Sequence, residues 1–284
     1  MNATVCISII IPSYNQAPWL EACLESILKQ NYPNLEVIII DGGSTDNSVD
    51  VIKRYAHHLT YWVSERDRGQ SHALNKGFAK ASGNWITWLN SDDLLLPGSL
   101  ISLQQHIIAY PDVQWWIGNG WFIDSQGKNL KIFKSPKGIS QPKDLCPWTE
   151  NWLPQPGSFF TSQLLEKTGA YLREDLHYAM DLELWLRFLQ YTKPRIIDYD
   201  MAAYRLHNQS KTVSMMPSVE AEIVKVFAEH LGLEKALERV KWLAGDRYFY
   251  EERYQELIIK LKPFIKVVSM FKYIKHNKHK LHKI

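Results

Sequence analysis

Four short apolar runs in the first 95 residues each end in a polar loop, and helical patterns separate them. The runs comprise Val5–Ile11, Leu35–Ile40, Thr60–Val63 and Trp85–Leu89. Between the first two runs, Leu20, Leu24 and Leu28 recur at the spacing of one helix face. Strands that alternate with helices form parallel sheets, so this part of the chain predicts a doubly wound α/β fold.

The pattern changes after the first 110 residues. Further strands are expected at Val113–Ile117, Trp121–Asp124, Leu130–Phe133, Arg195–Asp198 and Ala202–Leu206. An amphipathic helix is expected from Asp181 to about Tyr191, and from Pro217 onward the chain reads as helices. We therefore predict an α/β domain over residues 1–215 and a helical C-terminal extension over residues 216–284.

Composition and cysteine usage indicate a soluble globular protein in a reducing compartment. Of the 284 residues, 45% are hydrophobic and 22% are charged, which is ordinary for such a protein. Its three cysteines, Cys6, Cys23 and Cys146, lie far apart without metal-ligand spacing. The apolar run Ile7–Ile11 is too short to span a bilayer. We expect a cytoplasmic protein, or one at the cytoplasmic face of a membrane.

The net charge of +3 hides an asymmetry. From Arg253 to the end there are nine Lys or Arg residues against one Glu, which leaves a balance of −5 for the preceding 252 residues. The segment around Phe264 to Ile274 alternates apolar residues with lysines, and such a segment can contact an anionic membrane peripherally. The alternative is a helix that packs on the α/β domain and ends in a solvated tail. Because the basic residues are confined to the terminus, no nucleic-acid partner is expected.

Two adjacent carboxylates, Asp92 and Asp93, follow the apolar run Trp85–Leu89. Two like charges at the end of a strand repel each other and are costly to desolvate, so they need a partner. A divalent cation such as Mg²⁺ or Mn²⁺ suits such oxygen ligands. The alternative is an acidic cap for the helix expected near Pro97.

The other polar clusters also follow strands. They comprise Pro12–Asn15, Asp41–Ser44, Ser64–Gln70 and Asn90–Asp93. Ligands of doubly wound sheets lie at the carboxyl ends of the strands, so these clusters predict one ligand site. The sequence contains neither a Gly-x-x-x-x-Gly-Lys-Ser/Thr phosphate loop nor a Gly-x-Gly-x-x-Gly turn after the first strand. A P-loop nucleotidase and a nicotinamide dehydrogenase are therefore disfavoured.

Four motifs in order carry a resemblance to a known family. They are IIPSYN at residues 10–15, VIIIDGGSTD at 37–46, GQSHALNKG at 69–77 and WLNSDD at 88–93. Over residues 5–210 the chain resembles the family 2 inverting glycosyltransferases. The resemblance implies a GT-A fold, which is a doubly wound mixed sheet with a Rossmann-like nucleotide-binding half and an acceptor half.

The resemblance also implies substrates and a cofactor. The donor would be a nucleoside-diphosphate sugar, with a UDP-sugar favoured, and the cofactor a divalent cation, Mn²⁺ or Mg²⁺. The acceptor would be a glycan or lipid-linked hydroxyl in cell-surface polysaccharide biosynthesis. Two alternatives stay open: a nucleotidyltransferase on a similar sheet, and a non-catalytic subunit that binds nucleotide sugar.

Eight residues match the donor nucleotide-binding positions of the family. They are Pro12, Tyr14, Asn15, Asp41, Ser71, Asn75, Asn90 and Ser91. Tyr14 would stack near the nucleobase and Asp41 would accept a hydrogen bond from it, while Ser71 and Asn75 would line the nucleoside. The alternatives are a core aromatic for Tyr14 and a turn residue for Asp41.

The metal-binding positions fall on Asp92, Asp93 and His207, with Asp92 as the ligand and Asp93 as a neighbour or supporting group. Many relatives carry Asp where this chain has Asn90, and Asn adds no negative charge. A single His after a strand is often structural, so His207 carries that alternative. Arg205 and Lys211 are alternative contacts for the diphosphate.

Asp181 matches the catalytic general base, at the start of a helix; the alternative is a helix-capping residue. Many relatives carry Glu before the base, where this chain has Met180. Glu183, two positions further along the helix, points elsewhere and should not share the role.

Four residues match the acceptor and sugar side: Trp148, Trp152, Gln155 and Gly157. The alternative for both tryptophans is simple packing of a long loop. The Gln-x-x-Arg-Trp motif of processive family members is absent from the sequence, so transfer of a single sugar is expected.

Overall fold

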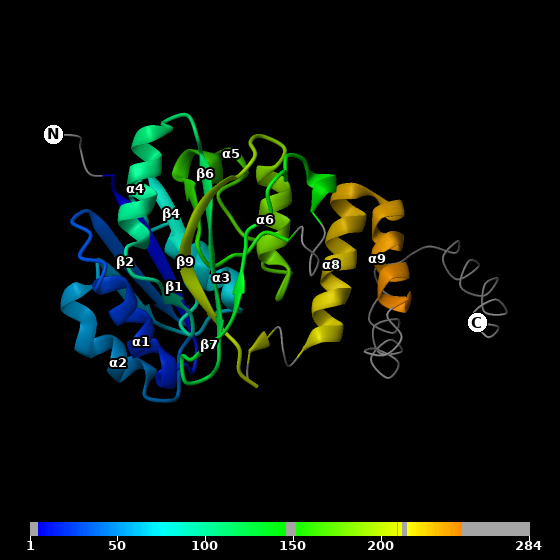
Figure 1. The fold of residues 1–284 in the computed structure, drawn as a ribbon. Coiled ribbons are helices and arrows are strands. Elements are labelled where there is room, and N and C mark those ends of the chain that lie inside the picture. Colours follow the sequence, from blue (N-terminus) through cyan, green and yellow to red (C-terminus); the bar gives the residue numbers. More distant parts are fainter. Residues whose placement is uncertain (1–4, 146–151, 209, 212–214, 246–284) are drawn as a thin grey trace. The chain divides into compact units, whose positions relative to one another are not determined.

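The apolar runs assemble into one mixed sheet in the computed structural model, which describes residues 5–145, 152–208, 210–211 and 215–245 (Figure 1). The described strands form a nine-stranded sheet in the order β3-β2-β1-β4-β8-β6-β9-β5, with β7 paired to β6. The chain divides into two units, Met1–Ser214 and Met215–Ile284. The sequence places the boundary at residue 215.

The first half of the sheet is parallel. Its strands are β1 (Ile7–Ser13), β2 (Leu35–Asp41), β3 (Tyr61–Ser64) and β4 (Trp85–Trp88). The intervening helices are α1 (Ala17–Leu28), α2 (Ser48–Tyr55) with a 3-10 turn at Ala56–His58, and α3 (Gln70–Phe78). Because the four strands run in the same direction, their carboxyl ends and the polar loops after them lie at one edge of the sheet.

The second half mixes directions. Its strands are β5 (Leu94–Leu95), β6 (Trp115–Ile123), β7 (Asn129–Phe133), β8 (Ser158–Thr161) and β9 (Arg195–Arg205). Its helices are α4 (Ser99–Ala109), α5 (Ser162–Lys167) and α6 (Met180–Phe188), with a 3-10 turn at Pro142–Asp144. Strand β8 joins the halves by antiparallel pairing with β4 and β6, and β9 runs parallel to β6. This mixed sheet confirms the predicted fold class.

Two pairs of predicted strands are single strands in the structure. Val113–Ile117 and Trp121–Asp124 belong to β6, and Arg195–Asp198 and Ala202–Leu206 belong to β9. The β6–β9 register shifts at Asn119. A Cβ on Gly120 would lie 2.2 Å from the Ala202 carbonyl oxygen, so the glycine permits the backbones of β6 and β9 to approach closely. The sequence pattern predicted a break between two strands at this point.

Clustered aromatic side chains fill the core beside β4. Trp88 stacks on Trp185 with ring centroids 5.7 Å apart, and Trp115 lies 5.0 Å from Trp185. Phe160 and Phe188 complete the cluster at 5.0 Å from each other. Most of these rings are fully buried, so tryptophan enrichment here reflects packing of the core.

The second unit contains α8 (Met216–Leu231) and α9 (Leu233–Gly245). Arg239 donates to both carboxylate oxygens of Glu220, at 2.7 and 3.0 Å, and both side chains are buried. Burial raises the pKa of Glu220 while Arg239 opposes the shift. Within the described residues, no helix combines the length and apolar character that crossing a bilayer requires. The predicted basic amphipathic segment lies outside the described residues.

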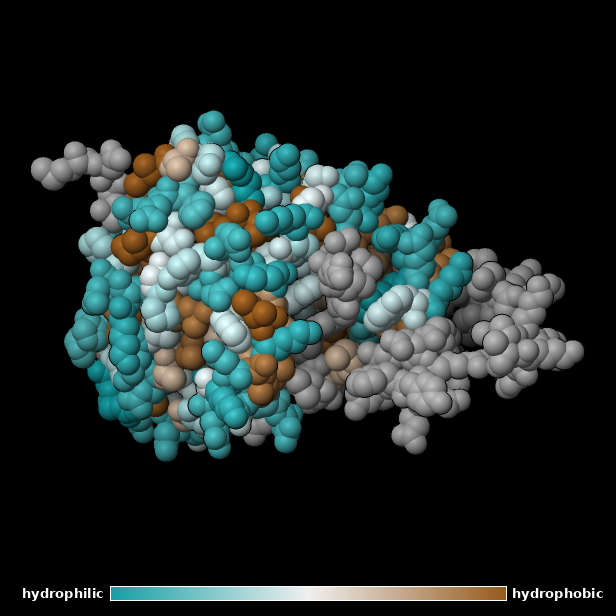
Figure 2. Space-filling view, viewed as in Figure 1, coloured by the Kyte–Doolittle hydropathy of each residue, from teal (hydrophilic) through white to brown (hydrophobic). Residues whose placement is uncertain are grey.

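Hydrophilic residues cover the outer faces of α1 and α2 in the view of Figure 2. The inner face of α1 carries the apolar stripe that the sequence predicts, with Leu20 and Leu24 buried in the sheet core, and α2 buries Val51 and Ile52 in the same core. This amphipathic packing holds the two helices against the parallel half of the sheet. The polar loops lie at the carboxyl ends of its strands.

Helix α3 packs so closely on β1 that Gly77→Ala should destabilise the protein. The added Cβ would lie 2.3 Å from Ile10 Cγ2. Overpacking a core costs about 1–3 kcal/mol, which outweighs the helix propensity gained over Gly, about 1 kcal/mol. Urea unfolding should show a lower midpoint. In Gly77→Ala/Ile10→Ala the combined loss should be smaller than the sum of the single losses. A raised midpoint for Gly77→Ala would contradict the close packing.

Candidate functional site

Asp92 and His207 meet at the carboxyl edge of the sheet, although 115 positions separate them. Asp92 follows β4, and His207 follows β9. His207 Nε2 lies 2.9 Å from Asp92 Oδ2. The imidazole ring packs on Trp19 of α1 with centroids 4.0 Å apart. The structure therefore brings together two of the three residues predicted to bind metal, and it adds Trp19, which was not predicted as a site residue.

Arg205 holds the backbone around this pair. Its guanidinium donates to the carbonyl oxygens of Asp92 at 2.7 Å, Asp124 at 3.0 Å and Ser125 at 3.2 Å. Burial lowers the pKa of Arg205, and the charges of Asp93 and Asp92 oppose that shift. The side chain is only 3% exposed, so its donors serve protein carbonyls. This arrangement favours Lys211 over Arg205 as a residue that can reach a ligand.

Asp93 is fully buried beside Asp92. Its carboxylate accepts from the Arg205 backbone N–H at 2.8 Å and from Asn90 Nδ2 at 3.2 Å. Burial, followed by the charge of Asp92, raises the pKa of Asp93 well above its ordinary value. The two carboxylates therefore have different surroundings: Asp92 faces His207, whereas Asp93 joins β9 to the end of β4.

Asn90 is the centre of a network of side-chain amides. Its Oδ1 accepts from Gln70 Nε2 at 2.7 Å, and its Nδ2 donates to Asp93 and to Gln155 Oε1, the latter at 3.4 Å. Lys211 Nζ donates to Gln70 Oε1 at 2.9 Å. An aspartate at position 90 would have no N–H to donate to Asp93. Asn90, which stands where many family members carry Asp, can therefore stabilise the buried Asp93 by a hydrogen bond. Gln70 was missed as a site residue, although it lies inside the third family motif.

The loops after β1 and β2 are joined by Asp41, which is fully buried. Its carboxylate accepts from the Gly43 and Ser44 backbone N–H groups at 3.1 and 2.9 Å, and from the hydroxyls of Ser44 and Ser64 at 2.5 and 2.7 Å. These four bonds give Asp41 a structural task in the loop; its predicted contact with the nucleobase stays a prediction.

The β1 loop presents Tyr14 to solvent, with 59% of the residue exposed. The alternative of a core aromatic is therefore wrong for this residue. Asn15 adopts a left-handed φ of 52°, and its Oδ1 accepts from the Thr45 backbone N–H at 2.8 Å. Pro12 and Ser91 are buried at the ends of β1 and β4. The exposed ring of Tyr14, next to a loop that Asn15 holds by a hydrogen bond, is compatible with stacking on a nucleobase.

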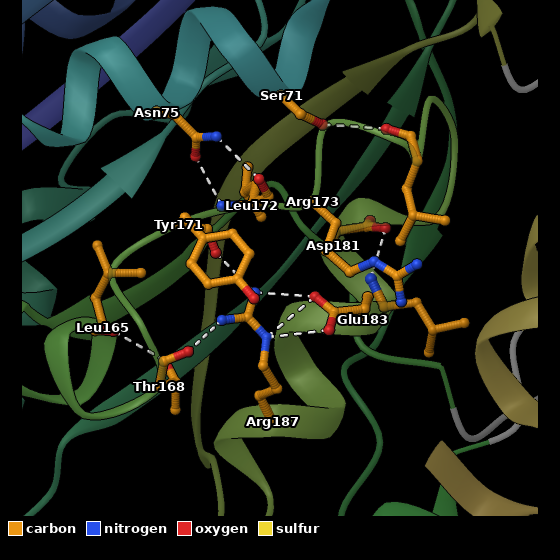
Figure 3. Close-up of polar contacts among 12 residues, drawn as sticks. Ser71, Asn75, Leu165, Thr168, Tyr171, Leu172, Arg173, Asp181, Glu183 and Arg187 are labelled. Atoms are coloured by element: carbon orange, nitrogen blue, oxygen red, sulfur yellow. Dashed lines mark hydrogen bonds and ion pairs between the residues drawn. The ribbon is translucent and has the colours of Figure 1, made fainter. Parts of the chain in front are cut away.

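Ser71 and Asn75, which were predicted to line the nucleoside, bond to the segment before α6 (Figure 3). Ser71 Oγ donates to the Leu176 carbonyl at 3.1 Å. Asn75 binds both backbone groups of Leu172, with its Nδ2 donating at 2.9 Å and its Oδ1 accepting at 2.7 Å. No sequence signal pointed to these partners, which are about a hundred residues away.

Asp181 lies in the first turn of α6, and its Oδ1 accepts from the Leu182 backbone N–H at 2.7 Å. Negative charge is favoured at a helix N-terminus, so the carboxylate form of Asp181 fits its position. Glu183 has a different role. It is buried and pairs with Arg187, whose Nη2 lies 2.9 Å from Glu183 Oε2. Glu183 therefore belongs to a structural ion pair, whereas the sequence predicted only that it would not share the role of Asp181.

Of the residues expected on the acceptor side, Trp148 lies outside the described residues. Trp152 is partly buried and packs on Phe133 with centroids 5.9 Å apart. Gln155 is buried and donates to the Trp88 carbonyl at 2.7 Å. Gly157 has a φ of 81°, which favours glycine. Gln155 therefore lies next to Asn90, whereas Trp152 performs at least a packing role.

Asp92 and His207 fit a divalent cation as a pair. Among the described residues, no group of three His, Cys, Asp or Glu side chains gathers to hold a metal ion by itself. Two neighbouring ligands of an octahedral Mg²⁺, each about 2.1 Å from the ion, lie about 3 Å apart. The 2.9 Å between Asp92 Oδ2 and His207 Nε2 matches that spacing. Mg²⁺ sites typically take one or two carboxylates, such as that of Asp92, and complete the shell with substrate phosphates and water.

Similar proteins are glycosyltransferases. An uncharacterized glycosyltransferase of Rickettsia typhi, RT0329, is 29% identical over 220 residues, which cover 75% of this chain and 68% of the relative. Glycosyltransferase GlyA of Streptococcus pneumoniae is 34% identical over 125 residues. That match covers 43% of this chain and 18% of GlyA, so the chain spans less than a fifth of that relative.

Solved structures share the fold. The S. aureus TarS fragment 1–349 in complex with UDP-GlcNAc is 16% identical, with a TM-score of 0.67 over 91% of this chain and 80% of that chain. Mannosyltransferase PcManGT from Pyrobaculum calidifontis, in complex with GDP-Man and Mn²⁺, is 17% identical, with a TM-score of 0.62 over 92% of this chain and 87% of that chain. At these identities the likeness shows the fold alone.

The family model described as glycosyl transferase family 2 matches residues 8–167. That range includes all four motifs on which the resemblance was based and ends before Asp181 and His207. Because it covers more than half of the chain, the protein belongs to glycosyl transferase family 2.

Proposed function

We propose that this protein transfers one sugar from a nucleoside-diphosphate sugar to an acceptor hydroxyl with inversion at the anomeric carbon. The observation that carries the proposal is the convergence of Asp92 and His207, 2.9 Å apart, beside the Asn90 network. We favour a UDP-sugar as donor, in keeping with the UDP-GlcNAc bound to the TarS fragment. The acceptor would be a glycan or lipid-linked hydroxyl in cell-surface polysaccharide biosynthesis.

Asp92 and His207 would hold the divalent cation. Mn²⁺ in the PcManGT complex supports this choice of ion. His207 Nδ1 is buried without a hydrogen-bond partner among the described residues, so Nε2 is the ring nitrogen that reaches the site. When bound, the ion would neutralise negative charge on the diphosphate leaving group. Asp93 would support the site from the second layer, through Arg205 and Asn90.

Lys211 would bind the diphosphate directly. Its ammonium lies 2.9 Å from Gln70 Oε1, and Gln70 contacts Asn90 next to Asp92. The residue is exposed, unlike Arg205, so its charge is accessible to a ligand. An ammonium group is a common point contact for phosphate.

Asp181 would act as the general base. As the acceptor oxygen forms its bond to the anomeric carbon, the bond from that carbon to the diphosphate oxygen breaks, and the acceptor proton moves to Asp181. Attack opposite the leaving group inverts the anomeric carbon. The start of α6 favours the ionised carboxylate that this role needs. Met180, where relatives carry Glu, leaves Asp181 as the acidic residue at this point of the helix.

Asp92→Ala and His207→Ala should each remove cation-dependent binding of nucleoside diphosphate. Each variant deletes one of the two proposed protein ligands. Calorimetric titration of UDP with and without Mn²⁺ checks the change, with Asp198→Ala, an exposed carboxylate of β9, as the matched control. Unchanged Mn²⁺-dependent binding in Asp92→Ala would exclude the ligand role.

Lys211→Ala should raise the UDP dissociation constant about 10- to 100-fold, because a charge-assisted hydrogen bond contributes about 1.5–3 kcal/mol. Titration at two salt concentrations should show a weaker salt dependence than the wild type. Lys134→Ala, which removes an exposed lysine beside Asp198, is the control. Equal affinities for the Lys211→Ala and control proteins would assign the diphosphate contact elsewhere.

Asp181→Asn should abolish transfer and leave UDP binding within about twofold of wild type, because the amide cannot accept the acceptor proton. Release of nucleoside diphosphate from the donor measures transfer, and calorimetry measures binding. Asp50→Asn on the exposed face of α2 serves as the control. Transfer near the wild-type rate would mean that another group is the base.

A further inference from the structure

One segment outside regular secondary structure, residues 168–177, connects α5 to the start of α6. Backbone groups without a helix or sheet partner need other partners when they are buried. The N–H groups of residues 168–170 and of Leu176 bond to backbone carbonyls, and four carbonyls of the segment bond instead to side chains from α3 and α6 (Figure 3). The position of the first turn of α6, which contains Asp181, therefore depends on these side-chain bonds.

Helix α3 and the residue before it lie along the segment. Gly69 precedes α3 beside His177, since a Cβ added to Gly69 would lie 3.7 Å from His177 Nδ1. Two positions further along α3, Ser71 binds the Leu176 carbonyl, and four positions beyond that, Asn75 binds both backbone groups of Leu172. The segment thus runs antiparallel to the first two turns of α3.

Helix α6 holds the other side of the segment. Arg187 donates to the Thr168 carbonyl and, at 2.7 Å, to the Tyr171 carbonyl, and its guanidinium lies 4.8 Å from the Tyr171 ring. Glu183 fixes Arg187 through three contacts of 2.9 to 3.1 Å. Four carbonyls of the segment are therefore taken by side chains of two helices.

The same end of α3 also contacts the WLNSDD motif of residues 88–93. Gln70, which lies between Gly69 and Ser71, donates to Asn90 Oδ1 at 2.7 Å. Successive residues of one helix therefore touch the residues beside Asp92 and the segment that leads to Asp181. A rigid helix that touches both elements can fix their separation.

We propose that Asn75 is a positioning residue for Asp181, which rests on the proposed role of Asp181 as the base. With Ser71, it holds the 168–177 segment so that α6 begins where Asp181 can reach the acceptor hydroxyl. The side-chain bonds of Ser71 and Asn75 to Leu176 and Leu172 support this role, and the predicted contact of both residues with the nucleoside stays a prediction.

Asn75→Ala should lower kcat about 10- to 100-fold, since a displacement of about 1 Å in a reacting group costs about that much. The UDP dissociation constant with Mn²⁺ should stay within about twofold. Amide hydrogen exchange of the peptide spanning 171–181 should become faster, because its clamp is lost. Ser71→Ala, which removes one bond, should show the same changes to a smaller degree and covers the case in which Asn75→Ala folds poorly.

Gln30→Ala is the matched control. Gln30 is a half-buried amide of the α1 region that donates to the Leu96 carbonyl at 2.9 Å and to the Ser26 carbonyl at 3.1 Å. Its loss should change thermal stability and leave kcat and the exchange of residues 171–181 unaltered. If Gln30→Ala lost a comparable part of kcat, the loss in Asn75→Ala would be explained by general destabilisation, and the inference would be overturned.

The outcomes separate the two proposals. Wild-type kcat in Asn75→Ala, or a raised UDP dissociation constant at unchanged kcat, overturns the positioning role, and the second result supports the predicted nucleoside contact. Asp181→Asn is measured in parallel. If Asp181→Asn keeps its activity, the proposed base is wrong; if it is inactive while Asn75→Ala is fully active, only the positioning role fails.

Discussion

The repulsion between two adjacent carboxylates at the end of β4 is the constraint on which this site depends. Asp92 and Asp93 cannot both be buried as anions without compensating partners. The last residue of β9, Arg205, donates its backbone N–H to the Asp93 carboxylate, and its guanidinium binds the backbone carbonyl of Asp92. The long strand β9 therefore does more than complete the sheet. It ends where His207 can meet Asp92.

The two carboxylates are not equivalent. Asp93 is fully buried and belongs to the structural joint between β4 and β9, whereas Asp92 faces the imidazole of His207. Asn90 satisfies Asp93 with an N–H that aspartate does not have. Asn90, in place of the Asp of many family members, therefore provides a hydrogen bond to Asp93 and leaves the Asp92–His207 pair in place.

Helix α3 extends this organisation toward α6. Its first residues bind the amide network through Gln70, and the next turns bind the backbone before α6 through Ser71 and Asn75. On the other side, Glu183 and Arg187 use a buried ion pair to bind the same segment. Glu183, two positions from Asp181, thus has a different role, because it is buried and pairs with Arg187.

The sequence by itself determined the parallel half of the sheet, the edge at which polar loops gather and the residue types at that edge, because hydrophobic periodicity is local and the alternation of strands with helices follows from chain order. It also indicated Asp92, Asp181 and His207 through motifs. Only the tertiary structure decided that β6 and β9 are continuous, that Arg205 serves backbone carbonyls, and that Asn75 binds Leu172. These are contacts between segments about a hundred residues apart, and side-chain partners at that separation are selected by packing, which no local pattern contains.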